Sequence, residues 1–499
     1  MSAELLMGVD LGTSSVKAVV IAPDGRMLAR AAVEYPVLTP RPGWAEQDPV
    51  TWVEATLATM RQALSDAGVP GAAIAAVGLS GQMHGTVCLD AQGTVLHPAI
   101  IWADQRSRAQ VARVMLEIGT ARLGAWTGNP LATGFMLATW LWLREEAPEI
   151  ARATRTLLLP KDYLRYALTG TLGTEPSDAS STLLFDTARC CWSAPLLAAL
   201  DIDVSLLPPV HDSAAVAGTL LPGIAEATSL LPGTPVVYGA SDQACQALGH
   251  GVLEPGVLSL TIGTGGQLFA PVVAPVYDPD LRLHLFCHAL PDRWHLEAAT
   301  LSAGLALRWL RDQIFAGTSY SELAAWAAEV PPGAEGLFFL PYLAGERTPH
   351  MDPSARAAFL GLTLRHHRGH LIRAAMEGVV FALRQGLELM ESLSVPVTRV
   401  VASGGAAQSP LWLQLQADIL NRPIDRTRTV EAAAVGAAFL AGVGSGLVAD
   451  LPTACRLGVQ WEGEAILPEA ANAARYARAY AAYCKLYAAV EAYQSAQVS

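Results

Sequence analysis

The most constraining feature of this chain is one sequence pattern that occurs twice, about half a chain apart. Residues 5–20 read LLMGVDLGTSSVKAVV and residues 257–269 read VLSLTIGTGGQLF, so each is an apolar run, a Gly-Thr turn and a second apolar run. Both patterns predict a β-hairpin. Glycine lets the backbone aim N–H groups at an anion, and threonine adds a hydroxyl donor. Two such tips predict two similar domains that close on a polyphosphate, although Gly-Thr is also common in ordinary turns.

Length and composition restrict the class of protein. A chain of 499 residues exceeds what one hydrophobic core usually serves, so two domains are expected. Hydrophobic residues make up 52% and charged residues 16%, which favours large buried cores over a disordered chain. The net charge of -12 argues against a nucleic-acid partner, because nucleic-acid-binding proteins carry a basic face.

Three observations favour a cytoplasmic protein. We find no long apolar stretch that is free of charge, so neither a membrane-spanning helix nor a membrane partner is expected. Glu4 and Asp10 lie where a signal peptide would have a cationic start and an apolar run. The seven cysteines show no CxxC spacing, and Cys190 and Cys191 are adjacent. That pattern is typical of reduced thiols and not of a disulfide framework or a zinc site.

Lysine usage restricts the way in which the chain could bind a nucleotide. The only three lysines are Lys17, Lys161 and Lys485, and none is followed by Ser or Thr, so the chain has no P-loop. If the chain binds ATP, the Gly-Thr hairpins must hold its phosphates. Lys17 follows the first tip and is the nearest candidate cation, but a solvated strand position explains it equally well.

Strands followed by helices in both halves predict a two-domain α/β protein. In the first half we expect strands at 5–10, 15–22, 27–35, 75–79, 86–90, 95–102 and 235–239, and helices at 50–67, 105–118 and 131–147. In the second half we expect, after the hairpin, a strand at 398–402 and helices at 302–316, at 369–393 and from 409. The predicted domains are 1–249 and 250–499, with a C-terminal helical extension from about 467.

The last predicted helix carries a stripe of tyrosines. Tyr476, Tyr480, Tyr483 and Tyr487 are spaced by four, three and four residues, which places them on one helix face. Such a stripe serves packing or a partner and not chemistry. A homodimer formed through this face is therefore one expectation, beside packing inside the chain.

Two aspartates lie at strand ends beside candidate ligand loops. Asp10 directly precedes the first Gly-Thr tip, where a carboxylate would repel phosphate unless Mg²⁺ lies between them. A turn aspartate that bonds its own backbone is the alternative. Asp242 lies where a strand ends and a helix begins, the edge at which open α/β sheets bind ligands. We expect the helix N-terminus to keep Asp242 ionised, so that it can accept a hydroxyl proton; an ordinary N-cap is the alternative.

Two further groups could bind a sugar. Met83 and His84 lie between glycines in a loop that joins two strands, although a single histidine is more often structural than functional. Trp102, Asp104 and Arg106 follow the next strand and combine an aromatic wall with polar groups, as sugar sites often do.

Together these motifs resemble those of the FGGY carbohydrate kinases, and among them the xylulokinases closely. The resemblance extends over nearly the whole chain. Its motifs are GVDLGTS at 8–14, WAEQDP at 44–49, GQMHG at 81–85, LPKDY at 159–163, GERTPH at 345–350, GGA at 404–406 and EAAAVGAA at 431–438. GQMHG and GERTPH are quite specific, whereas Gly-Thr tips are shared by all actin-like ATPases.

The resemblance implies two actin-like, ribonuclease-H-like ATPase domains with a catalytic cleft between them, and phosphoryl transfer from ATP-Mg²⁺ to a sugar. It implies that Asp242 takes the proton from the terminal hydroxyl of D-xylulose and that Asp10 positions Mg²⁺. The sugar would contact Met83, His84, Asp242 and Gln243, to which the residues themselves add Trp102 and Asp104. ATP would contact Gly12, Thr13, Ser14, Gly263, Thr264, Trp309, Gly405, Ala406 and Ser409, with Lys17 as the nearby cation.

Two departures from the family pattern lie near the expected substrate. Family members commonly have Asn at the positions of Gln243 and Ala103. A kinase for another ketose or polyol, such as ribulose, a hexulose or gluconate, is therefore an alternative. A non-catalytic actin-like ATP-binding protein would also explain the hairpins, but it leaves Met83, His84, Asp104 and GERTPH without a role.

Overall fold

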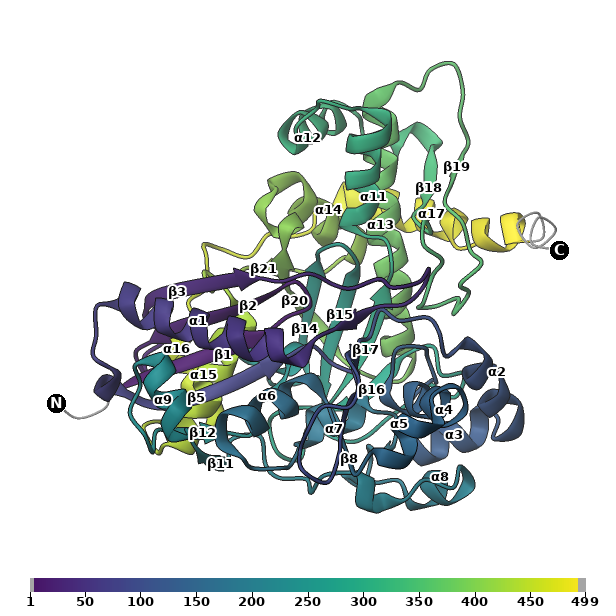
Figure 1. The fold of residues 1–499 in the computed structure, drawn as a ribbon. Helices are drawn as coiled ribbons and strands as arrows, with labels where there is room; N and C mark the ends of the chain where they lie inside the picture. The colour runs from purple at the N-terminus through teal and green to yellow at the C-terminus, as the bar shows by residue number, and fades with distance from the viewer. Residues whose placement is uncertain (1–3, 492–499) are drawn as a thin grey trace.

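The computed structural model describes residues 4–491, and each half contains a mixed β-sheet (Figure 1). The first sheet has seven strands in the order β11–β12–β5–β1–β2–β3, with β13 beside β5. Their bounds are β1 Leu5–Leu11, β2 Ser15–Ile21, β3 Met27–Glu34, β5 Ile74–Gly81, β11 Val216–Thr219, β12 Pro235–Val237 and β13 Ala240–Ser241. The first hairpin is confirmed, because β1 is antiparallel to β2 and parallel to β5.

The second sheet repeats this arrangement. Its six strands have the order β16–β17–β15–β14–β20–β21. Their bounds are β14 Gly256–Ile262, β15 Gly266–Val272, β16 His284–Cys287, β17 Trp294–Thr300, β20 Val397–Gly404 and β21 Ile424–Asp425. β14 is antiparallel to β15 and parallel to β20, as β1 is to β2 and β5. The repeated sequence pattern thus marks a repeated topology, and the predicted two-domain α/β class is confirmed.

One face of the first sheet is covered by α1 (Pro49–Ala67), which packs on β2 and β3. Its bounds follow from local chemistry. Pro49 occupies the first turn, the Asp48 carboxylate accepts a hydrogen bond from Val50 N, and Gly68 ends the helix in the left-handed conformation. These signals explain why the helix predicted at 50–67 is found almost unchanged.

The opposite face of the first sheet is covered by a helix from the far end of the chain. α15 (Ala432–Gly444) packs on β1 and β5 (Figure 1). It also lies beside α10 (Asp242–Gly249). This close approach requires glycine: a Cβ atom at Gly8 would lie 1.8 Å from the Ala434 carbonyl oxygen. Both halves of the chain therefore contribute to the layer that borders the cleft.

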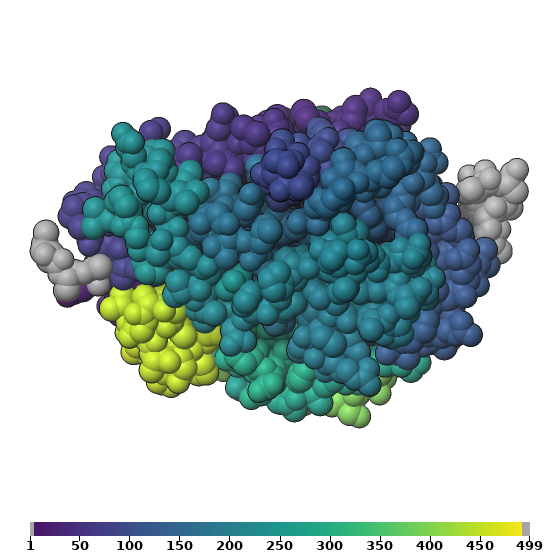
Figure 2. Space-filling model, turned by 60° about the horizontal axis from the view of Figure 1, so that its bottom comes forward, coloured from purple at the N-terminus to yellow at the C-terminus, as the bar shows by residue number. Residues whose placement is uncertain are grey.

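A lobe of short elements is inserted between β5 and β11, and Figure 2 shows the face that it forms in blue and teal. Its elements are β6 Val87–Leu89, β7 Ala99–Ile100, α2 Arg108–Glu117, α3 Thr120–Thr127, α4 Met136–Glu146, α5 Pro148–Ala153, β8 Thr156–Leu158, α6 Pro160–Thr169, α7 Pro176–Ser181, β9 Phe185–Asp186, β10 Cys191–Trp192 and α8 Ala194–Ala199. The strand predicted at 95–102 is shorter, at Ala99–Ile100, because Pro98 has no N–H for a strand ladder.

The second half has its own helical layer. Its helices are α11 Gly304–Trp309, α12 Tyr320–Ala328, α13 Arg368–Ser392, α14 Pro410–Leu420 and α17 Ala470–Tyr483. The helix predicted at 302–316 is α11 followed by a π-helical turn at Leu310–Ile314, and those predicted at 369–393 and from 409 are α13 and α14. Within residues 4–491, no helix is both long enough and apolar enough to span a bilayer.

The tyrosine stripe of α17 packs inside the chain. The Tyr476 hydroxyl donates to Glu377 Oε1 at 2.7 Å and accepts from Arg373 Nη2 at 2.6 Å. The Tyr480 hydroxyl donates to Glu388 Oε2 at 2.9 Å, and Tyr483 is fully buried. These side chains belong to the core of the second half, so they do not form a face for a partner.

Candidate active site

The first hairpin tip, residues 12–14, is tied to the inserted lobe. The Thr13 hydroxyl accepts a hydrogen bond from Trp102 Nε1 at 2.9 Å and donates one to Gln82 Oε1 at 3.3 Å. Gln47 Nε2 donates to the Thr13 carbonyl oxygen at 2.6 Å. The structure thus brings together two predicted site residues, Thr13 and Trp102, and fixes the position of the tip.

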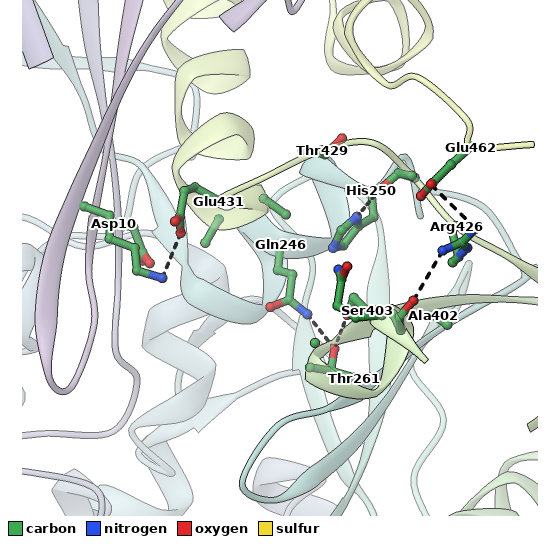
Figure 3. A pocket seen from close by; sticks show the side chains of 17 residues that line it. Asp10, Gln246, His250, Thr261, Ala402, Ser403, Arg426, Thr429, Glu431 and Glu462 are labelled. Carbon is green, nitrogen blue, oxygen red and sulfur yellow. Dashed lines mark hydrogen bonds and ion pairs between the residues drawn. The ribbon is translucent and has the colours of Figure 1, made fainter. Parts of the chain in front are cut away.

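Asp10 lies at the cleft end of β1, opposite Lys17 of β2. Burial raises the pKa of the Asp10 carboxyl, although Ser80 Oγ donates a hydrogen bond to it at 2.8 Å. Lys17 already has a partner, because its Nζ lies 2.7 Å from Glu431 Oε2 (Figure 3). Sequence reasoning placed Glu431 in the motif EAAAVGAA but gave it no role; it directly precedes α15 and reaches the hairpin from the other half of the chain.

A cavity of about 260 Å³ lies in the cleft, between Asp10 and Lys17 on one side and β14 and β20 on the other. Figure 3 shows Asp10, Gln246, Thr261 and Ser403 around it. Polar side chains line it. Gln246 Nε2 donates to Thr261 Oγ1 at 2.7 Å, and the Thr261 and Ser403 hydroxyls are 2.8 Å apart. Hydroxyl and amide donors at these positions suit an anionic ligand.

A larger cavity, of about 590 Å³, lies within the second half. Five predicted nucleotide-site residues line it: Gly263, Thr264, Gly405, Ala406 and Ser409. Leu305, Tyr320, Ala324 and Trp412 add an apolar wall. This volume and lining suit a purine nucleoside. Trp309 differs from the prediction: it lies half-buried against the core of the second half, whereas its neighbour Arg308 lines the cavity.

Asp242 is the first residue of α10 and not its N-cap. Ser241 is the N-cap, and its Oγ accepts a hydrogen bond from Ala244 N at 3.4 Å. Asp242 Oδ1 is buried, and none of the described residues hydrogen-bonds to it. The carboxyl group is therefore not used for capping and has an oxygen available for a ligand.

The expectation that the helix N-terminus keeps Asp242 ionised is wrong. Burial raises the pKa of Asp242 to about 8, and the negative charges of Asp10 and Glu297 add to the effect. Hydrogen bonds from Gln243 lower the pKa only in part. The energy lost on removing a carboxylate from water outweighs the favourable end of a short helix.

A fully buried charge network supports the strand end that precedes Asp242. Its members are Lys161, Asp162, Arg165, Glu175 and Asp178. Lys161 Nζ lies 3.8 Å from Glu175 Oε1, and the Ser177 hydroxyl donates to the same oxygen at 2.8 Å. Ser177 Oγ in turn accepts from Ser241 N at 2.9 Å. The network therefore fixes the backbone next to Asp242.

His84 lies in the loop between β5 and β6, with a φ of 73° and its ring centroid 3.8 Å from that of Phe135, the two ring planes tilted by 30°. Its Nδ1 lies 2.9 Å from the Ser181 carbonyl oxygen. Because a carbonyl only accepts, Nδ1 carries the proton and Nε2 is an acceptor. Burial lowers the pKa of His84 to about 3, so the ring is neutral. A neutral ring in this tautomer can accept a hydrogen bond from a hydroxyl group.

Two predicted sugar ligands are engaged inside the protein. Met83 is 4% exposed and packs in the core of the inserted lobe. Asp104 Oδ2 accepts from Ala45 N at 2.7 Å and from Arg106 Nε at 2.9 Å. Ala103 packs against the core of the first half. A direct contact of Met83 or Asp104 with a ligand stays a prediction.

Two charged side chains of the second half act on this site. Glu297, on β17, raises the pKa of Asp242, and Arg347 lowers the pKa of His84, in each case after the larger effect of burial. Sequence reasoning singled out the motif GERTPH at 345–350, which contains Arg347, but assigned no role to Arg347. The only available signal for Glu297 was that it is the one acidic residue of the segment that forms β17.

The fold and the paired loops correspond to a known class of enzyme. Residues 5–249 match the N-terminal domain and residues 258–445 the C-terminal domain of the FGGY family of carbohydrate kinases. The chain belongs to this family and is an ATP-dependent sugar phosphotransferase.

Three relatives show what the chain is similar to. It is 36% identical over 482 residues to the xylulose kinase of Bacillus subtilis (strain 168), covering 97% of this chain and 96% of that protein. It is 32% identical to a gluconokinase of the same organism, covering 87% and 86%. The crystal structure of ligand-bound xylulose kinase from Lactobacillus acidophilus has a TM-score of 0.94 and 26% sequence identity, covering 99% and 100%.

The residues present fit a Mg²⁺ ion shared with the nucleotide. Across residues 4–491, no three His, Cys, Asp or Glu side chains are grouped as a metal site of their own. Asp10 offers one carboxylate at the edge of the cleft cavity. Mg²⁺ is usually held by one or two carboxylates together with water and substrate phosphates, so Asp10 is the residue that would hold it.

Proposed function

We propose that this protein transfers the γ-phosphoryl group of ATP to D-xylulose, giving ADP and D-xylulose 5-phosphate. The observation that carries the proposal is Asp242, a half-buried residue whose buried Oδ1 has no hydrogen-bond partner among the described residues and whose carboxyl group feels the charge of Asp10 beside the first Gly-Thr hairpin. The similarity to xylulose kinases over nearly the whole chain supports the choice of sugar.

Each half of the chain has a separate task in this mechanism. The nucleoside binds in the 590 Å³ cavity, and its phosphates lie along Gly263 and Thr264 toward the cleft. Asp10 would hold Mg²⁺, which would neutralise phosphate charge. The hydroxyl groups of Thr261 and Ser403 donate to the phosphates from the second half, and the Gln246 amide donates from the end of the first half.

Asp242 accepts the proton of the attacking hydroxyl group as phosphoryl transfer proceeds. None of the described residues hydrogen-bonds to Asp242 Oδ1, so the sugar hydroxyl can donate its hydrogen bond to this oxygen directly. His84 Nε2 accepts a hydrogen bond from another hydroxyl and orients the sugar. The buried network around Lys161 holds the strand end, which keeps the base and the hydroxyl at reacting distance.

A kinase for another ketose, a polyol or gluconate is the second candidate. It is favoured by Gln243 and Ala103, where family members commonly have Asn, and by the similarity to a gluconokinase. A non-catalytic actin-like ATP-binding protein is not retained, because the chain belongs to a family of kinases.

The test is a coupled assay of ADP release with Mg-ATP and a panel of sugars, for the natural protein and for Asp242→Ala. We expect a strong preference for D-xylulose and a rate at least ~100-fold lower in the variant, since general base catalysis contributes 10²–10⁴-fold. Preference for another sugar would replace D-xylulose as the substrate. ADP release that no sugar stimulates would contradict the proposed function altogether.

A further inference from the structure

One face of β16 and β17 is turned toward the first half of the chain. Successive side chains of a strand point to opposite faces, and Leu285 and Leu296 lie in the core of the second half. Glu297 pairs in register with His284, so both side chains lie on the other face. His284 Nδ1 lies 3.2 Å from Asn129 Oδ1. This face therefore meets the inserted lobe.

Several buried polar atoms on this face have no partner. Glu297 is 6% exposed, His284 5% and His295 0%. None of the described residues hydrogen-bonds to Glu297 Oε2, to His284 Nε2 or to either ring nitrogen of His295. His295 Nε2 lies 4.0 Å from Glu297 Oε2, beyond hydrogen-bonding distance. Buried polar groups in native proteins are nearly always paired, so this group indicates a ligand with several hydroxyl groups.

Electrostatic effects connect this face to the candidate active site. The charge of Glu297 contributes to the raised pKa of Asp242. The charge of Arg347 acts on Glu297, on His84 and on His284, so its guanidinium lies close to residues from both halves. Ring contacts connect them directly, because the ring centroid of Phe135 lies 3.8 Å from that of His84 and 5.6 Å from that of His284. The unpartnered atoms therefore belong to the same site as Asp242 and His84.

We propose that Glu297 is a specificity residue that hydrogen-bonds a hydroxyl group of the sugar and excludes sugar acids. The inference rests on the proposed function and deepens it, because it makes the sugar site a joint product of both domains and restricts its substrates to uncharged sugars. In the reactive form, in which Asp242 is ionised, Glu297 and Asp242 present two negative charges against one guanidinium from Arg347. A substrate carboxylate such as that of gluconate would meet this excess of negative charge.

The test uses Glu297→Gln, which keeps the shape of the side chain and removes its charge. At pH 8 we expect the KM for D-xylulose to rise about tenfold, the KM for Mg-ATP to stay the same, and the ratio of kcat/KM for gluconate to that for D-xylulose to rise at least tenfold. Glu297→Asp should keep the discrimination against gluconate. Glu377→Gln is the matched control, since Glu377 is also a buried carboxyl of the second half but bonds to Arg373 and Tyr476.

Failure of the Glu297 inference and failure of the proposed function would give different results. If the natural protein phosphorylates D-xylulose and Glu297→Gln leaves both KM and the substrate ratio unchanged, Glu297 does not contact the sugar. If the natural protein phosphorylates no sugar, the proposed function fails, and calorimetric titration of D-xylulose without nucleotide decides the role of Glu297. Binding weakened at least tenfold in Glu297→Gln but not in Glu377→Gln would support the contact; equal binding in both would overturn it.

Discussion

At the scale of single residues, the proposed role of Asp242 as the base makes the reaction depend on the protonation of this carboxyl group. Its pKa is raised to about 8, chiefly by burial, so the free protein at pH 7 holds most of this carboxyl protonated. A protonated carboxyl cannot accept the hydroxyl proton. We therefore predict that kcat/KM for the sugar increases as pH rises from 6 and levels off above about 8, because kcat/KM reports the ionisation of the free enzyme.

The measurement is the pH profile of kcat/KM between pH 6 and 9.5, with a coupling system shown not to limit the rate. Asp242→Asn, which has no carboxyl group, should lose the rise together with most of the activity. A profile that is flat across this range would show that Asp242 is already ionised or is not the base.

Lys161 is the residue on which the buried network depends. It is fully buried and lies 2.9 Å from Asp162 Oδ1 and 3.3 Å from Asp178 Oδ2. Lys161→Met removes the cation and leaves its carboxylate neighbours without it. We predict a loss of about 3–5 kcal/mol in the free energy of unfolding, the usual cost of an uncompensated buried charge. Chemical denaturation measures it, with the exposed Lys485→Met as control; equal unfolding midpoints would show that the network does not need the lysine.

At the scale of elements, the contact between α10 and α15 depends on the absence of a side chain. A Cβ atom at Gly436 would lie 1.9 Å from the Cys245 carbonyl oxygen. Since backbone cannot move aside cheaply, we predict that Gly436→Ala destabilises the protein by about 1–3 kcal/mol. Gly223→Ala is the control, because no atom lies within 4 Å of a Cβ there. A melting temperature unchanged in Gly436→Ala would mean that the two helices are not in close contact.

The features that could be predicted from the sequence are those that neighbouring residues determine. The Gly-Thr hairpins and α1 were predicted almost to the residue, because turn and capping residues lie within the segments that they define. The pairing of Lys17 with Glu431 could not be predicted, since these residues meet only when α15 packs on the first sheet. The raised pKa of Asp242 could not be predicted either, because it depends on burial, and burial is determined by packing and not by the adjacent residues in the sequence.

At the scale of the whole molecule, the central strands of the two sheets share one topology, and the residues of the candidate site come from both halves of the chain. Asp242 and His84 belong to the first half, whereas Gly263, Thr264 and Glu297 belong to the second. α15, from the second half, packs on the first sheet. Glu431, which precedes α15, therefore forms an ion pair with Lys17 on the hairpin that carries Asp10. A change in the angle between the halves would therefore change the distance between the nucleotide loops and the base.

This arrangement predicts that the sugar closes the cleft. If ATP alone produced the closed form, water could take the place of the sugar hydroxyl beside Asp242 and the nucleotide would be hydrolysed. We expect the radius of gyration from X-ray scattering to decrease when D-xylulose and a non-hydrolysable Mg-ATP analogue are both present, and to change less with either alone. ATP hydrolysis without sugar should be at least ~100-fold slower than sugar phosphorylation, in keeping with water exclusion by closure. Scattering curves that do not respond to the sugar would mean that the halves already hold the reacting geometry, and protection from hydrolysis would then have to come from the local packing around Asp242.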